Sequence, residues 1–287
     1  MTNGSMMCVV GICCLAAAVG RAAPVEPDMP VSAWLFDTWS PTVVSDSFGG
    51  NDGTPVNMPV GTWSADHPGV DASFAYAQNH CLDLSGTDGY ANLGRPSDLD
   101  LVPKTDAFTL AAWIRAEDGE YGGLLSKADA AASERQYMLM VRSDGRLSAV
   151  IGGKNELVPA PSMMDGTWHH VAVRVDATGQ ELYLDGTRYN LGDGQPRGSI
   201  GSKTLDVDVL IGARNDGGGV GYRYTGQLDE LAVWNTALSP ENIEWLAQNS
   251  LYVLPDPATV VLLVAGATVL LRRRRRRLQA NSGWRRK

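Results

Sequence analysis

The clearest pattern of apolar and polar positions lies within residues 165–186. Apolar side chains occupy every second position over residues 171–175, and the same period of two returns over residues 182–184. Such alternation places the apolar side chains on one face of a pleated strand. The segment between the two runs contains Gly179, which can adopt the positive φ of a tight turn. The pattern predicts a β-hairpin with one apolar face, which needs a second layer to cover it.

Similar alternation predicts short strands along most of the chain. Residues 108–114 and 228–234 each carry apolar side chains at every second position, and turns rich in glycine separate such runs. About a dozen strands predict an all-β fold, a two-sheet antiparallel jelly-roll sandwich. Ser239 and Pro240 have the residue types of a helix N-cap and first helical position, so a single terminal helix is expected to run to about residue 249.

Several of these runs carry motifs with a recognisable order. Residues 165–172 read DGTWHHVA and are followed about ten residues later by LYLDG; residues 226–239 read GQLDELAVWNTALS. Residues 108–115 read FTLAAWIR, and an Asp/Asn/Gly-rich loop lies at 46–53. Together they resemble bacterial laminin-G-like domains of the concanavalin A-like lectin/glucanase superfamily. The resemblance runs from about residue 31 to residue 249 and implies the same sandwich, but one fold hosts many functions.

The N-terminal end has the features of an export signal. Residues 6–19 form an apolar run that is too short to span a bilayer and is typical of a secretory signal peptide. We therefore expect a signal peptide over residues 1–23 and the laminin-G-like domain over residues 24–250.

The C-terminal end has the features of a membrane segment. Residues 251–271 are mostly apolar and just long enough to cross a membrane, and six arginines follow, which favour a cytoplasmic end. With Pro255-Asp256-Pro257 ahead of the apolar run, residues 251–287 resemble a PEP-CTERM sorting tail, which implies cleavage by an exosortase-like enzyme. A plain transmembrane anchor is the alternative. Either way, the protein is expected to be exported and held at the cell envelope, or released outside the cell after processing.

Charge is divided unevenly between the domain and the tail. Nine of the 24 basic residues lie beyond residue 271, which leaves residues 1–271 with 15 basic and 32 acidic residues and a net charge of −17. A domain this acidic repels phosphate backbones, so nucleic acid is not an expected partner. Cys81 is the one cysteine outside the predicted signal peptide, which excludes an intrachain disulfide in the mature domain and predicts a small buried side chain.

Asp229 is the most informative acidic residue, because strict alternation places it on the same face as Leu231 and Val233. A carboxylate on the core side of a strand costs several kcal/mol unless it is compensated. Ca²⁺ is one solution, since it binds six to eight oxygen atoms. Related sandwiches hold a structural calcium ion where such a loop meets the last strand, so Asp46, Asn51 and Asp229 are the expected ligands. Alternatively, Asp229 caps loop N–H groups and Asp46 starts a turn.

The resemblance implies a glycan ligand. Tyr121, Tyr222 and Tyr224 lie in or beside Gly-rich loops, where their rings could stack on sugars, and they are the expected ligand contacts. A glycoside hydrolase of this superfamily would need two glutamates on one strand face, in a Glu-x-Asp-x-x-Glu pattern, and the sequence contains none. The expected function is therefore a non-catalytic exported module that binds polysaccharide or a glycoconjugate. The alternative is a structural or adhesive matrix protein that binds protein partners.

Overall fold

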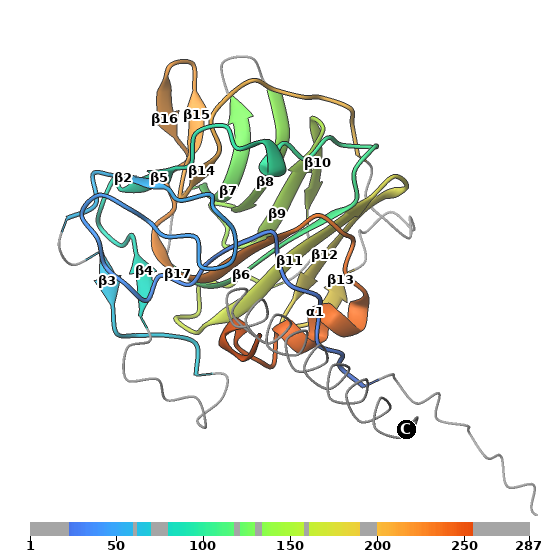
Figure 1. The fold of residues 1–287 in the computed structure, drawn as a ribbon, viewed down its shortest axis with the longest axis horizontal. Coiled ribbons are helices and arrows are strands. Elements are labelled where there is room, and N and C mark those ends of the chain that lie inside the picture. The colour runs from blue at the N-terminus through green and yellow to red at the C-terminus, as the bar shows by residue number, and fades with distance from the viewer. Residues whose placement is uncertain are drawn as a thin grey trace, which may run out of the picture.

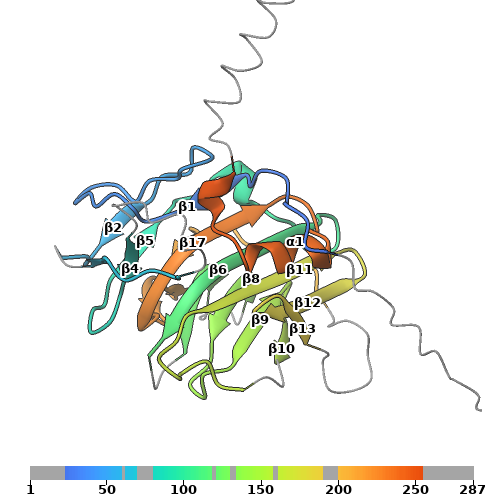
Figure 2. The same ribbon diagram turned by 90° about the horizontal axis from the view of Figure 1, so that it is seen from below.

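The computed structural model describes most of the central part of the chain. The described residues are 23–59, 62–69, 80–117, 121–129, 134–157, 161–189 and 200–254. The predicted signal peptide up to residue 22 and the predicted tail from residue 255 onward lie outside them. Over the described part, the chain forms two stacked β-sheets with one short α-helix on the outside (Figures 1 and 2).

The two sheets confirm the predicted antiparallel sandwich. The eight-stranded sheet has the order β13 (Thr187–Tyr189), β12 (Gly179–Leu184), β11 (His169–Asp176), β6 (Phe108–Ala116), β17 (Gly226–Trp234), β4 (Cys81–Asp83) and β3 (Trp63–Ser64), and β1 (Ser32–Trp34) also pairs with β17. The nine-stranded sheet has the order β10 (Lys154–Leu157), β9 (Leu147–Ile151), β8 (Glu134–Val141), β7 (Gly122–Asp129), β14 (Leu210–Ile211), β5 (Tyr90–Asn92) and β2 (Thr54–Val56). The hairpin of β15 (Arg214–Asp216) and β16 (Gly219–Gly221) joins this sheet beside β7, through one parallel bridge between Asn215 and Asp129.

The apolar core fills the space between the sheets. The alternate valines of β11, the leucines of β12 and the alternate apolar residues of β6 point into it, as their sequence pattern predicted. From the other sheet, β8 contributes Tyr137, Leu139 and Val141. The hydroxyl of Tyr137 donates to the carbonyl oxygen of Leu99 at 2.9 Å, so this polar atom is satisfied although the side chain is fully buried.

The outer face of the eight-stranded sheet is covered by α1 (Pro240–Leu246) and by a 3-10 turn, Leu251–Val253 (Figure 2). Residues of both segments pack on small and aromatic side chains of the sheet, namely Ala111, Ala172, Tyr183, Ala232 and Trp234. The helix begins as predicted: Ser239 Oγ accepts from the N–H of Asn242 at 3.2 Å, and Asn242 Oδ1 accepts from the N–H of Ser239 at 3.0 Å. It ends at Leu246, earlier than expected.

The first residues of the expected C-terminal tail pack against the sandwich. Leu251 and Leu254 are buried in the apolar cluster beneath α1, although they were expected to start the membrane-crossing stretch. They belong to the sandwich instead, because their side chains help to cover the outer face of the sheet. Within the described residues, no helix combines the length and apolar character needed to cross a membrane.

Strand β17 contains a β-bulge that changes the orientation of Asp229. Asp229 pairs with Trp113 of β6, but the register shifts by one residue directly afterwards, and Glu230 there has φ +46°. Because directly paired residues share a face, Asp229 lies on the outer face with Trp113, whereas Leu231 and Val233 point into the core. The expectation that Asp229 shares a face with these two residues is wrong, because strict alternation does not survive an inserted residue.

Candidate functional site

Two of the three tyrosines predicted as ligand contacts lie together on the outer face of the nine-stranded sheet. The rings of Tyr121 and Tyr222 are stacked, with 5.2 Å between centroids and 21° between planes. Both are half-buried and pack over a small apolar cluster, which consists of Ala128, Met138, Met140 and Val150. The pair forms a supported aromatic surface of the kind on which the C–H face of a sugar ring packs.

Tyr224 does not belong to this surface. Its side chain is 1% exposed, and its hydroxyl donates to the carbonyl oxygen of Gln227 at 3.1 Å. The backbone of Gly122 lies so close that a Cβ atom there would be 2.7 Å from the Cα atom of Tyr224. The prediction of Tyr224 as a ligand contact is therefore wrong, because its ring fills the interior.

Three arginines surround the stacked tyrosines. The guanidinium carbon of Arg214 lies 3.6 Å from the ring centroid of Tyr222, and that of Arg142 lies 5.3 Å from the ring centroid of Tyr121. Arg135 is held beside them: burial lowers its pKa below the usual arginine value, and the like charge of Arg214 lowers it further. We call these five residues the Tyr–Arg surface.

The residue pattern alone does not point to these three arginines, and only the sheet pairing connects them. Arg135 and Arg142 lie near the two ends of β8, whereas Arg214 starts β15 much later in the chain. Both strands neighbour β7, one on each side, which brings the three side chains to one region. No spacing motif in the sequence carries that information, because the strands are distant in the chain.

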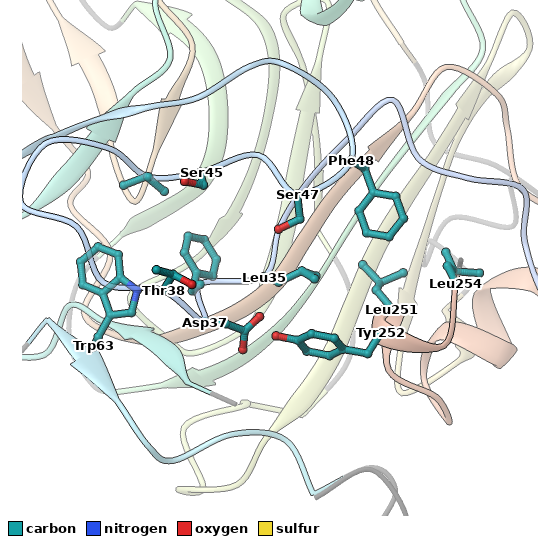
Figure 3. A pocket seen from close by; sticks show the side chains of 12 residues that line it. Leu35, Asp37, Thr38, Ser45, Ser47, Phe48, Trp63, Leu251, Tyr252 and Leu254 are labelled. Atoms are coloured by element: carbon teal, nitrogen blue, oxygen red, sulfur yellow. The ribbon is translucent and has the colours of Figure 1, made fainter. Parts of the chain in front are cut away.

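A separate cavity of about 340 Å³ lies between the segment that follows β1 and the C-terminal 3-10 turn (Figure 3). Its lining is largely apolar and includes Leu35, Phe48, Trp63 and Leu251. Figure 3 shows the carboxylate of Asp37 and the hydroxyl of Tyr252 turned toward each other in this space.

Three carboxyl groups in this part of the molecule have raised pKa values: Asp229 and Glu230 are buried, and Asp37 is half-buried. Burial raises the pKa of Asp37 and that of Glu230 to about 7, and it raises the pKa of Asp229 well above its usual value. Repulsion from Asp37 acts in the same direction on the other two. Glu230 accepts hydrogen bonds from the hydroxyl of Ser250 and from the N–H of Leu251, the latter at 2.9 Å. Of the three carboxyl groups, Asp37 is the one that lines the cavity.

The residues expected to bind calcium do not converge on one point. Asp46 accepts hydrogen bonds from its own loop and from β1: its Oδ1 accepts from the N–H groups of Ala33 on β1 and of Phe48 and Gly49, and its Oδ2 accepts from that of Asn51. The amide nitrogen of Asn51 donates to Ser32 Oγ at 2.7 Å and to Asp98 Oδ2 at 2.9 Å.

Asp229 lies elsewhere and has a different environment. Ala33, the residue that anchors Asp46, pairs with Ala232, which lies beyond the bulge from Asp229. The Oδ1 atom of Asp229 accepts from the N–H of Glu230 at 2.7 Å. Within the described residues, no group of three His, Cys, Asp or Glu side chains could hold a metal ion. Asp46, Asn51 and Asp229 therefore do not fit one Ca²⁺ site; Asp46 instead organises its loop by accepting N–H groups.

The family of the chain follows from its sequence as well as from this architecture. A model of the concanavalin A-like lectin/glucanases superfamily matches residues 85–244, which is more than half of the chain. The chain therefore belongs to this superfamily, and the predicted laminin-G-like domain is confirmed at that level.

The chain spans only a small part of the length of the relatives that it matches. The chain is 29% identical over 176 residues to the mouse sushi, von Willebrand factor type A, EGF and pentraxin domain-containing protein 1, covering 58% of this chain and 5% of that protein. It is 28% identical over 158 residues to human pentraxin-4, covering 49% and 31%. Among solved structures, a mutant Trypanosoma rangeli sialidase that displays trans-sialidase activity matches with a TM-score of 0.53 at 16% identity, covering 76% of this chain and 32% of that one. At that identity, the likeness concerns the fold alone.

Proposed function

We propose that this protein is a carbohydrate-binding module and that the Tyr–Arg surface holds the saccharide. The observation that carries the proposal is the stacked, half-exposed pair Tyr121 and Tyr222 on its apolar support. An aromatic platform of this kind matches the apolar face of a sugar ring, while nearby donors can bind hydroxyl groups. Membership of the lectin/glucanase superfamily supports a glycan as the ligand class.

The proposal is for binding without catalysis. Glycoside hydrolysis normally needs two carboxyl groups that face one ligand at about 5 to 10 Å from each other. The Tyr–Arg surface consists of two tyrosines and three arginines, and of the three carboxyl groups with raised pKa values only Asp37 lines the described cavity. Among the residues that the structure describes, neither location therefore presents an acid and a nucleophile or base to a common substrate.

Retention on immobilised polysaccharides tests the proposal. The full-length chain, kept in a detergent without a sugar headgroup, is expected to bind one glycan class, and Tyr222→Ala is expected to weaken this binding about fivefold, for a loss of about 1 kcal/mol. Tyr189→Ala is the matched control, since Tyr189 lies on β13 at the edge of the other sheet. Equal retention of the two variants would place the ligand elsewhere, and no retention on any glycan would favour a protein-binding matrix role.

We also propose that the protein is exported and that its C-terminal tail is processed by an exosortase-like enzyme. The support is the order of Pro255-Asp256-Pro257, an apolar run and six arginines, all outside the described residues. Mass spectrometry of the mature protein from exosortase-positive and exosortase-negative cells tests this. An intact C-terminus at Lys287 in both would instead indicate an uncleaved tail.

A further inference from the structure

Two of the three guanidinium nitrogens of Arg214 are buried without a hydrogen-bond partner among the described residues, although the group stacks on Tyr222. Arg214 is 3% exposed, and the two atoms are Nε and Nη1. The Nε atom of Arg135 is buried and unpartnered in the same way. A buried cation is costly unless an anion or hydrogen-bond acceptors replace the water that it has lost. The two arginines are therefore incompletely compensated by the part of the chain that the structure describes.

Other arginines of the chain form ion pairs with carboxylates, which Arg135 and Arg214 do not do among the described residues. Arg95 forms ion pairs with two aspartates, and Arg142 of the Tyr–Arg surface lies 3.5 Å from a carboxylate oxygen of Asp144. Among the described residues, no carboxylate forms an ion pair with Arg135 or Arg214. Over the described ranges, the component that this surface lacks is an anion.

We propose that the Tyr–Arg surface recognises a saccharide that carries a carboxylate, with the sugar ring on Tyr121 and Tyr222 and the carboxylate paired with Arg214 and Arg135. This inference rests on the proposed function, since it specifies the class of glycan bound there. A planar guanidinium donates two parallel hydrogen bonds to a carboxylate. A sugar acid carries that anion directly beside a ring that can stack, so one ligand satisfies both halves of the surface.

The net charge of the domain further limits the class of anionic ligand that can bind. Residues 1–271 carry a net charge of −17, so a long polyanion is repelled by the domain as a whole. The local attraction of the arginines acts over a short range, because salt screens charges beyond about 10 Å. The surface therefore suits a glycan with isolated or terminal carboxylates, and not a continuous polyanion such as a nucleic acid.

Calorimetry with matched ligands tests the inference on the full-length chain. The probes are oligosaccharides that end in glucuronic acid, their carboxyl-reduced counterparts, and sulfated counterparts of the reduced form. We expect the carboxylated form to bind about tenfold or more tightly than the reduced form, as a charge-assisted contact provides. Arg214→Met is expected to abolish this preference, and Arg135→Gln to reduce it. Arg115→Gln removes the same charge from β6 of the other sheet and should leave the preference unchanged.

A second test measures the thermal stability of the protein without any ligand. Because Arg214→Met replaces a buried charge that forms no ion pair with a described residue by an apolar chain of similar length, it should raise the Tm of the ligand-free protein by about 3 °C or more. A lower Tm would show that the charge is already compensated within the protein and would overturn the inference.

The binding outcomes separate this inference from the proposed function. Equal affinity for carboxylated and reduced forms, with both lost in Tyr222→Ala, would overturn the carboxylate assignment and leave glycan binding in place. Tighter binding of the sulfated form would also overturn it. Failure of every saccharide to bind would overturn both proposals.

Discussion

Protonation of Glu230 is expected to control the stability of this domain near neutral pH. Glu230 is 6% exposed, and burial raises its pKa from 4.5 to about 7. An acid with a raised pKa in the folded state stays protonated there, so unfolding releases a proton when the pH lies between the unfolded and folded pKa values. The free energy of unfolding should therefore fall as the pH rises from about 4.5 to about 7 and become independent of this group above that range.

The size of the effect follows from the difference between the two pKa values. A difference of about 2.5 pH units, at about 1.4 kcal/mol for each, corresponds to about 3 kcal/mol. For a domain of this size, that is a decrease in Tm of about 6 to 12 °C between pH 4.5 and pH 7.5. Asp37, whose pKa is also raised to about 7, acts in the same direction but is partly exposed and contributes less.

Thermal melts of the wild type and of Glu230→Gln between pH 4.5 and pH 8 test this reasoning. The glutamine can keep both contacts, since its oxygen can accept from the N–H of Leu251 while its nitrogen donates to Ser250. We expect the two proteins to melt together at pH 4.5 and the variant to be more stable at pH 8. Glu244→Gln on α1 serves as a surface control. Equal pH slopes for the wild type and Glu230→Gln would refute the assignment.

Three further predictions concern the loop of Asp46, the C-terminal end of the domain at Leu251 and the expected Ca²⁺ ligands. Asp46→Ala removes the acceptor of four backbone N–H groups and should lower the free energy of unfolding by about 3 kcal/mol in a urea titration, whereas Asp52→Ala, which loses one such contact, should cost about 1 kcal/mol. Leu251→Ala should lower the free energy of unfolding by about 2 to 4 kcal/mol in the same assay, because this leucine is buried. A change near zero would indicate that Leu251 does not contribute to the folded domain. Because Asp46, Asn51 and Asp229 do not converge, EDTA and added Ca²⁺ should leave the Tm unchanged, and a calcium-dependent rise would contradict this arrangement.

Local pattern was sufficient for most of the fold. The alternation over 171–175 and 182–184 predicted the hairpin of β11 and β12, and Ser239 with Pro240 predicted the start of α1. These features depend on contacts between residues close in the chain, so the sequence shows them directly. Tyr121 and Tyr222 were also predicted as a candidate site, and the structure stacks them. Tyr224 has the same local context but is buried, because exposure depends on which strands lie over it.

What the sequence by itself determined is the class of fold, its strand pattern and the family of the chain. What only the tertiary structure decided is where charged side chains lie relative to one another. The bulge at Glu230 turned Asp229 away from its expected face, and the pairing of β7 with β8 and β15 placed Arg135 beside Arg214. The physical reason is that apolar alternation is a local property of each strand, whereas electrostatic compensation depends on partners that are distant in the chain.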